Sequence, residues 1–317
     1  MKLKPLKLKP AVKDYIWGGT ALKERWGKTS DTDTIAECWE FSLFPGSSSE
    51  VDEVLFKGFD LIKLYERYPE IFGKAAKNHK VFPILIKLID ANADLSVQVH
   101  PSDEYADKYE GGSLGKSEIW YIADAKEGAS IYYGFSRDVS REEAEKSIKE
   151  NTITSLLRKI PVKKGEFYYV PAGTVHALLA GVTVIEIQEN SNLTYRVYDY
   201  DRRDKAGNPR ELHVAKALEV MTLTASEPPR QDVPAKDIGG ATVRKMIKTP
   251  YFTSKEVTLH GEYLIYNEDS FVTFTVSEGE GEFEGGERFL KGETWLIPAG
   301  YMTKLISSHA VLVVTAL

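Results

Sequence analysis

The stretch that decides the fold occurs twice in this chain, as KKGEFYYVPAGTVHAL at residues 163–178 and as LKGETWLIPAGYMTKL at residues 290–305. Each copy has Lys-Gly-Glu, a short run of mainly apolar residues, Pro-Ala-Gly, and then a leucine. Such a unit enters a strand through a glycine turn and leaves it at a corner, because proline limits a strand and glycine permits a positive φ. The first copy has His176 where the second has Thr303.

Most of the remaining chain consists of short runs rich in β-branched and aromatic residues, bounded by glycine and proline, which is typical of strands. Three segments have a helical period instead, at residues 59–73, 139–160 and 211–221. In the second of these, Ser140 followed by acidic residues predicts an N-cap. Many short strands and repeated turns predict a mainly β protein, built from tandem jelly-roll barrels with a few inserted α-helices.

A polar, proline-rich connector at residues 225–236 lies between the two copies of the repeat. We therefore predict two domains. The first, residues 1–235, contains the helical insertions, and the second, residues 236–317, is a smaller β-barrel.

The composition is that of an ordinary globular protein, with 317 residues and a net charge of −6. An acidic balance without long basic runs predicts no nucleic-acid partner. The apolar runs are too short to cross a bilayer, and the lysine-rich start does not predict a signal peptide. A single cysteine, Cys38, excludes an internal disulfide and favours a cytoplasmic location. Its apolar neighbours predict a buried thiol rather than a nucleophile.

Candidate metal ligands come from three separate stretches. Residues two apart on a strand point the same way, so Gln98 and His100 share a face, as do Lys116 and Glu118. His176 follows the first Pro-Ala-Gly corner. Two imidazoles, a carboxylate and an amide oxygen form a plausible ligand set for a divalent ion such as zinc. The alternative is that these are ordinary hydrogen-bonded side chains on strands.

A second polar cluster follows His176 along the chain. Glu186 lies on a strand pattern, and Arg196 comes ten residues later on the next one. The two side chains could form an ordinary ion pair on an exposed sheet face. An acid and an arginine close to a metal would also suit an anionic sugar, because arginine binds phosphate oxygens and stabilises developing negative charge.

Four ordered motifs carry a resemblance to a known family: QVHP at 98–101, GKSEIWYI at 115–122, PAGTVHA at 171–177 and SNLTYRVYD at 191–199. Their succession resembles type I phosphomannose isomerase, a zinc enzyme of the cupin superfamily, in its short bacterial and archaeal form. The resemblance covers about residues 10–202 with specific motifs. The C-terminal part matches only as a second cupin barrel.

The resemblance implies one zinc ion per chain and assigns the residues that hold it. The implied ligands are Gln98, His100, Glu118 and His176. The resemblance also implies three catalytic residues, Lys116, Glu186 and Arg196. Many relatives have Ser-Asp four residues ahead of the arginine, whereas this chain has Asn192, which cannot act as a base. The first domain is then the metal-binding catalytic one, and the second, with Thr303, is metal-free.

The reaction implied is the interconversion of mannose 6-phosphate and fructose 6-phosphate through an enediol. The residues leave the base open among Glu186, Lys116 and a zinc-bound water. Phosphate could be bound by the serine-rich loop at residues 46–50, by Lys87 or by Arg137. The alternatives are a metal-dependent cupin of another specificity, such as an oxygenase, and a non-catalytic sugar-binding cupin. The sequence does not predict an oligomeric state.

Overall fold

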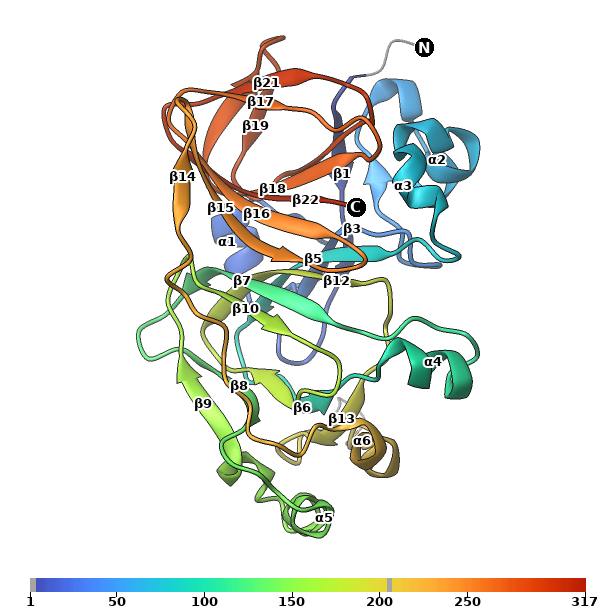
Figure 1. Cartoon of the computed structure of the whole chain (residues 1–317), viewed down its shortest axis with the longest axis vertical. Helices are drawn as coiled ribbons and strands as arrows, with labels where there is room; N and C mark the ends of the chain where they lie inside the picture. Colours follow the sequence, from blue (N-terminus) through green and yellow to red (C-terminus); the bar gives the residue numbers. More distant parts are fainter. Residues whose placement is uncertain (1–3, 204–206) are drawn as a thin grey trace.

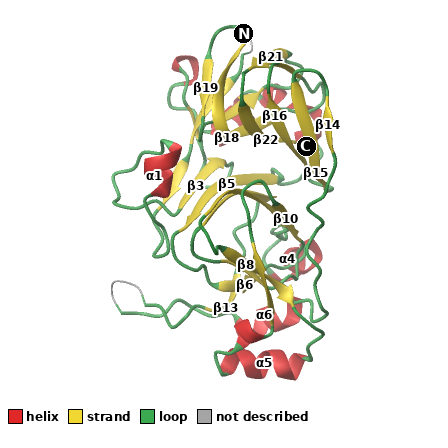
Figure 2. Cartoon of the chain, turned by 90° about the vertical axis from the view of Figure 1, so that its left-hand side faces the viewer, coloured by secondary structure: helices red, strands yellow, loops and turns green. Residues whose placement is uncertain are grey.

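The computed structural model describes residues 4–203 and 207–317, and it is mainly β with antiparallel sheets, as predicted. Figure 1 shows two β-rich bodies, one formed by the C-terminal part of the chain and the other by the middle part. Figure 2 shows helices at the ends and edges of the sheets rather than between them. In the described part of the chain, no helix is long and apolar enough to cross a membrane.

The first barrel is built from two sheets. The larger one has the order β10 (Phe167–Val170), β7 (Glu118–Ala125), β12 (Val182–Glu189), β5 (Ile84–Ala91), β3 (Glu37–Phe41) and β2 (Ala11–Lys13). The smaller one has the order β13 (Tyr195–Tyr198), β6 (Val97–Val99), β11 (His176–Leu178), β8 (Ser130–Phe135) and β9 (Leu157–Pro161).

The second barrel is built around one large sheet. Its main path is β14 (Ala235–Asp237), β15 (Ala241–Lys248), β16 (Thr253–Leu259), β22 (Ala310–Ala316), β18 (Val272–Phe283), β20 (Thr294–Ile297), β1 (Leu6–Lys9) and β4 (Glu50–Val51). Three strands pair off this path, namely β17 (Glu262–Ile265), β19 (Arg288–Leu290) and β21 (Thr303–Ile306). The N-terminal strand β1 thus pairs with β20 and joins a sheet on the far side of the connector, across the predicted domain division.

The described helices are short. They are α1 (Ala21–Trp26), α2 (Leu61–Arg67), α3 (Gly73–Lys77), α4 (Asp103–Tyr109), α5 (Arg141–Lys149) and α6 (Val214–Val220), with 3₁₀ turns η1 (Val54–Phe56), η2 (Pro69–Ile71) and η3 (Ile153–Ser155). Helix α6 lies where the period predicted a helix, and Ser140 caps α5 by accepting a hydrogen bond from the Glu143 amide at 3.1 Å.

Two of the helix predictions were too long. The segment 59–73 is split into α2 and η2 because Pro69 cannot continue a helix and restricts the residue before it. The segment 139–160 ends its helix at Lys149, and its last residues form strand β9, which pairs with β8. Tertiary pairing therefore overrides the local period of that segment.

The two Pro-Ala-Gly corners have the predicted conformation, with φ of 87° at Gly173 and 71° at Gly300. A Cβ on Gly173 would also lie 2.7 Å from Thr222 Oγ1, so glycine is required there for two reasons. The first corner leads directly into β11, and His176 is the first residue of that strand.

The two faces of the central strands have different roles. On β7, Ile119 and Tyr121 pack in the core between the barrels, where Phe41 stacks on Phe271 with ring centroids 5.0 Å apart. Trp120 points the other way, into the interior of the first barrel. The same alternation applies to Glu118 and places its carboxylate inside the first barrel.

Candidate metal centre and active-site cavity

Three buried side chains converge at one end of the first barrel. His100 follows β6, Glu118 begins β7 and His176 begins β11, and their ligand atoms all lie within 4.8 Å of one another. Glu118 Oε1 is 3.3 Å from His176 Nε2, and Glu118 Oε2 is 3.6 Å from His100 Nε2. Strand pairing brings this about, since β6 and β11 are neighbours with Gln98 directly opposite His176.

The hydrogen bonds of the two imidazoles decide which nitrogen faces the centre. His100 Nδ1 lies 2.8 Å from the Leu193 carbonyl, and His176 Nδ1 lies 2.8 Å from the Thr174 carbonyl. Each Nδ1 therefore carries the proton and donates it, which leaves the Nε2 atoms unprotonated and directed toward the centre, where a metal could bind them. Burial is the main cause that lowers the pKa of both rings, that of His176 to about 3, with the charge of Lys116 as a further cause.

These donor atoms fit a cation. Glu118 Oε1 is buried and accepts no hydrogen bond from a described residue, while His176 Nε2 faces it and His100 Nε2 faces Oε2. Burial and the nearby Glu186 carboxylate raise the pKa of Glu118, so its charge needs a positive partner. Lys116 supplies one charge, with Nζ 2.5 Å from Glu118 Oε2 and 3.0 Å from His100 Nε2. Two imidazoles and a carboxylate match the donor set that a borderline divalent ion prefers, and the Gln98 amide lies beside them, with its nitrogen 3.4 Å from His176 Nε2.

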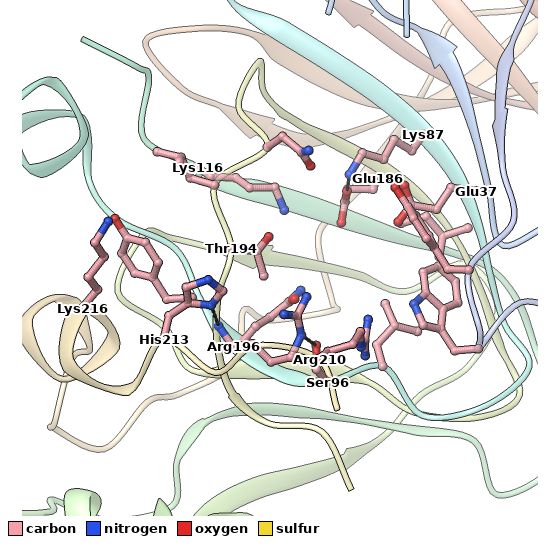
Figure 3. A pocket seen from close by; sticks show the side chains of 18 of the residues that line it. Glu37, Lys87, Ser96, Lys116, Glu186, Thr194, Arg196, Arg210, His213 and Lys216 are labelled. Atoms are coloured by element: carbon pink, nitrogen blue, oxygen red, sulfur yellow. Dashed lines mark hydrogen bonds and ion pairs between the residues drawn. The ribbon is translucent and has the colours of Figure 1, made fainter. Parts of the chain in front are cut away.

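This cluster opens into a polar cavity of about 460 Å³ (Figure 3). Its lining includes residues of both barrel sheets and of the segment that leads into α6: Tyr15, Trp17, Glu37, Lys87, Ser96, Gln98, Glu110, Lys116, Glu186, Asn192, Arg196, Arg210, His213 and Lys216, among others. Four of the seven predicted site residues line it, namely Gln98, Lys116, Glu186 and Arg196. The other three, His100, Glu118 and His176, are buried beside it, each within hydrogen-bonding distance of Lys116 or Gln98.

On one wall, Glu186 is held by two donors. Lys87 Nζ donates to Glu186 Oε1 and Trp120 Nε1 to Oε2, each at 3.0 Å, and Glu37 lies 3.8 Å from the same ammonium. Burial opposes ionisation of Glu186, but Lys87 and Lys116 outweigh it and lower its pKa to about 2. The predicted alternative, an exposed ion pair between Glu186 and Arg196, is wrong, because the partner is Lys87 and both members are buried.

Arg196 lies on the opposite wall, on β13, without a carboxylate within 4.0 Å among the residues that the structure describes (Figure 3). Its Nε donates to Ser96 Oγ at 3.2 Å and its Nη1 to the Glu211 carbonyl at 2.9 Å. Burial, followed by the charge of Arg210, lowers the pKa of Arg196. An arginine with no ionic partner that faces a cavity is available to an anionic ligand.

The sequence missed several lining residues. Glu37, Arg210, His213 and Lys216 were not among the predicted site residues, although all four line the cavity and the His213 ring lies next to the Arg196 backbone. Two of these basic residues are paired with acids: Lys216 Nζ lies 2.6 Å from Glu110, and Arg210 pairs with Asp199. The basic residues of the segment 210–216 were visible in the sequence, but no local pattern indicated that this segment lies near the metal ligands.

The three predicted candidates for phosphate binding lie in different environments. Lys87 lines the cavity. Arg137 does not, and pairs with Glu143 on the surface. Of the serine-rich loop, Ser49 is buried and bonds the Trp39 carbonyl at 2.8 Å, and no residue from 46 to 50 belongs to the lining.

The fold and the site together define a class of protein: a double β-barrel with a candidate metal centre at the base of a polar cavity. A sequence profile of the phosphomannose isomerase type I catalytic domain matches residues 5–112. The mannose-6-phosphate isomerase ManA of Bacillus subtilis is 40% identical over 320 residues, covering 100% of both chains. The mannose-6-phosphate isomerase of Streptococcus mutans is 37% identical and covers 93% of this chain and 92% of its own.

A solved structure of a relative has the same fold over the whole chain. The crystal structure of the mannose 6-phosphate isomerase from Bacillus subtilis superposes with a TM-score of 0.91 at 37% identity, over 99% of this chain and 100% of the other. The chain belongs to the type I phosphomannose isomerase family, as the sequence motifs predicted.

Proposed function

We propose that this chain interconverts mannose 6-phosphate and fructose 6-phosphate, with one zinc ion held by Gln98, His100, Glu118 and His176. The observation that carries the proposal is the buried His-Glu-His cluster at the base of a cavity whose opposite wall presents Arg196, which has no ionic partner among the described residues. Membership of the family supports the substrate, and the neutral imidazoles with unprotonated Nε2 atoms directed at Glu118 support the metal.

Zinc, when bound, supplies a Lewis acid that polarises the C1 and C2 oxygens of the open-chain sugar. The chain's own residues do the rest. Arg196 stabilises the negative charge that develops on oxygen when a proton leaves C2. It can do so because Ser96 and the Glu211 carbonyl orient the guanidinium without neutralising it.

Lys116 and Glu186 are the residues that we assign to proton transfer and its electrostatics. The Lys116 ammonium lies at the metal cluster and faces the cavity, so it can exchange a proton with a bound sugar. Glu186 already accepts hydrogen bonds from Lys87 and Trp120 and has a low pKa. It is therefore a weak base, and its main effect is to place negative charge next to the two lysines.

We place the substrate's phosphate at the wall formed by Arg210, His213 and Lys216. These three basic side chains line the cavity on the same wall as Arg196, opposite Glu186 and Lys87 (Figure 3). Arginine and lysine are the usual phosphate-binding groups. Ion pairs with Asp199 and Glu110 hold two of them in position.

The remaining proposals concern the whole chain. The division at residues 235 and 236 separates a catalytic metal-binding domain from a metal-free barrel, and Thr303, at the position that matches His176, supports this. The free buried thiol of Cys38 supports a cytoplasmic location.

The experiment is to convert mannose 6-phosphate in D₂O and follow the products by proton NMR. Fructose 6-phosphate with deuterium at C1 would support both the reaction and the enediol. Complete absence of solvent deuterium at every extent of conversion would overturn the enediol and leave the isomerisation. No fructose 6-phosphate from folded, zinc-loaded protein would overturn the proposed function.

A further inference from the structure

The second barrel contains a cavity of its own, of about 660 Å³. It opens between strands β15, β16 and β17, in the C-terminal body of Figure 1, and shares no described lining residue with the catalytic cavity. Its polar lining includes Lys245, Lys248, Thr253, Ser254, Lys255, Tyr263, Tyr266 and Asn267, and its apolar lining includes Met246, Ile265, Val272 and Val314.

Strand register places three lysines on one face of this barrel. Lys245 of β15 lies directly opposite Lys255 of β16, and Lys248 lies opposite Thr253. Thr253 and Lys255 are two residues apart and point the same way, and a bulge between Lys245 and Ile247 brings Lys248 onto the same face. All three lysines line the cavity.

This arrangement of charge is unfavourable unless something compensates for it. Like charges directly opposite each other on neighbouring strands destabilise a sheet. Among the described residues, none of the three ammonium groups has a carboxylate within 4.0 Å. Lys255 Nζ instead donates to the Tyr263 hydroxyl at 2.9 Å, which is a neutral acceptor. The cavity wall therefore carries three positive charges that no described acid balances.

The other lining residues indicate what the uncharged part of a ligand would contact. Val272, Val314 and Ile265 provide an apolar floor beneath the lysines, and the Tyr263 hydroxyl, which accepts from Lys255 Nζ, still has a proton to donate. A volume of this size is in the range of small-molecule sites. Lysine ammonium groups attract compact, strongly charged anions, and a phosphate dianion is the biological anion that best matches several of them.

We infer that the cavity of the second barrel binds a small organic phosphate, at a site independent of the catalytic cavity. The phosphate lies between Lys245 and Lys255, with Lys248 as a third cation, and the organic part rests on the apolar floor. A sugar phosphate and a nucleotide share this chemistry. The inference does not require the proposed isomerase activity.

The test is isothermal titration calorimetry of the zinc-loaded protein, which measures the affinity for fructose 6-phosphate in one arm and for adenosine monophosphate in the other. The K245Q/K255Q variant should lose at least about tenfold in affinity for the second site, because two charge-assisted contacts are removed. Lys236→Gln is the matched control, since Lys236 lies on β14 of the same barrel and does not line the cavity. It should bind as the parent does.

The two sites are told apart by a second variant. Arg196→Ala should weaken only the catalytic site, and K245Q/K255Q should keep the parent's isomerase activity. The compound that binds more tightly at the second site shows whether the site takes a sugar phosphate or a nucleotide. If neither arm shows binding that depends on Lys245 and Lys255, the inference is overturned, and the lysines serve only to protect the edge of β15 beyond β14.

Folding is not a confounding factor, because removal of opposed like charges should leave the urea midpoint of K245Q/K255Q unchanged or raise it. As an independent readout, the parent protein can be reductively ¹³C-methylated on its lysines. The signals of Lys245 and Lys255 should shift on addition of the phosphate that binds, and unshifted signals at saturation would contradict the inference.

Discussion

Replacement of Arg196 by alanine separates catalysis from stability more sharply than any other change at this site. The guanidinium makes two described hydrogen bonds, to Ser96 Oγ and to the Glu211 carbonyl, and has no ionic partner within 4.0 Å in the described chain. The pKa of Arg196 is lowered, mainly by burial and then by Arg210, so the folded protein disfavours its charge. Its removal therefore costs little.

The magnitudes follow from these contacts. Two lost hydrogen bonds cost about 0.5–1.5 kcal/mol each, and relief of desolvation and of repulsion from Arg210 offsets much of that. We expect a net change in the free energy of unfolding within about 1 kcal/mol, equivalent to a change of about 2–4 °C in Tm. Loss of a preorganised charge at a developing oxyanion should lower kcat/KM by about 10²–10³, or about 2.7–4 kcal/mol.

The assay couples fructose 6-phosphate formation to a dehydrogenase, with thermal unfolding measured on the same samples. Arg196→Lys should lie between the parent and the alanine variant, because it keeps the charge and loses the planar fork. Arg158→Ala is the control, since Arg158 bonds the Ser226 carbonyl at 2.9 Å outside the cavity. A kcat/KM within about threefold of the parent in Arg196→Ala would refute the role of this arginine.

Three further predictions concern the metal, the thiol and a buried acid. Glu118→Gln should abolish stoichiometric zinc binding in native mass spectrometry, because it removes the only carboxylate of the cluster, whereas Thr303→Ala at the matching position of the second barrel should keep it. Cys38 should react with a thiol reagent only after unfolding, since burial raises its pKa, and rapid labelling of folded protein at pH 8 would show that this packing is wrong. Burial raises the pKa of Glu189, with Asp103 as a further cause, so the folded state holds a proton that the unfolded state releases. Stability should therefore fall as pH rises above about 4.3, the usual glutamate value, and Glu189→Gln, which imitates the neutral acid, should reduce that fall in urea unfolding measured from pH 5 to 8.

Local periodicity was sufficient for the parts of the site that lie on single strands. Alternation on β6 directs Gln98 toward the cavity and Val97 and Val99 into the apolar cluster under α5 and α6. The repeated Pro-Ala-Gly corner predicted the positive φ at Gly173 and the entry of His176 into the barrel. These features depend on residues close together in sequence, so the sequence contains the signal.

Contacts between distant segments had no such signal. Glu37, Lys87 and Glu186 meet only because β3, β5 and β12 are neighbours in one sheet, and nothing local in their sequences indicates that pairing. The same holds for Lys216, which reaches the cavity through the docking of α6 on β13. Strand β1 was placed with the first domain by its position in the chain, whereas it pairs with β20 of the second as well as with β4.

Zinc-dependent isomerisation is best tested by measuring the conversion of mannose 6-phosphate by one protein sample in three states: as purified, after chelation, and after the return of zinc. We expect conversion that disappears on chelation and returns with about one zinc per chain bound at the His100, Glu118 and His176 cluster. Full conversion by metal-free protein, or no conversion by folded protein with zinc bound, would contradict it.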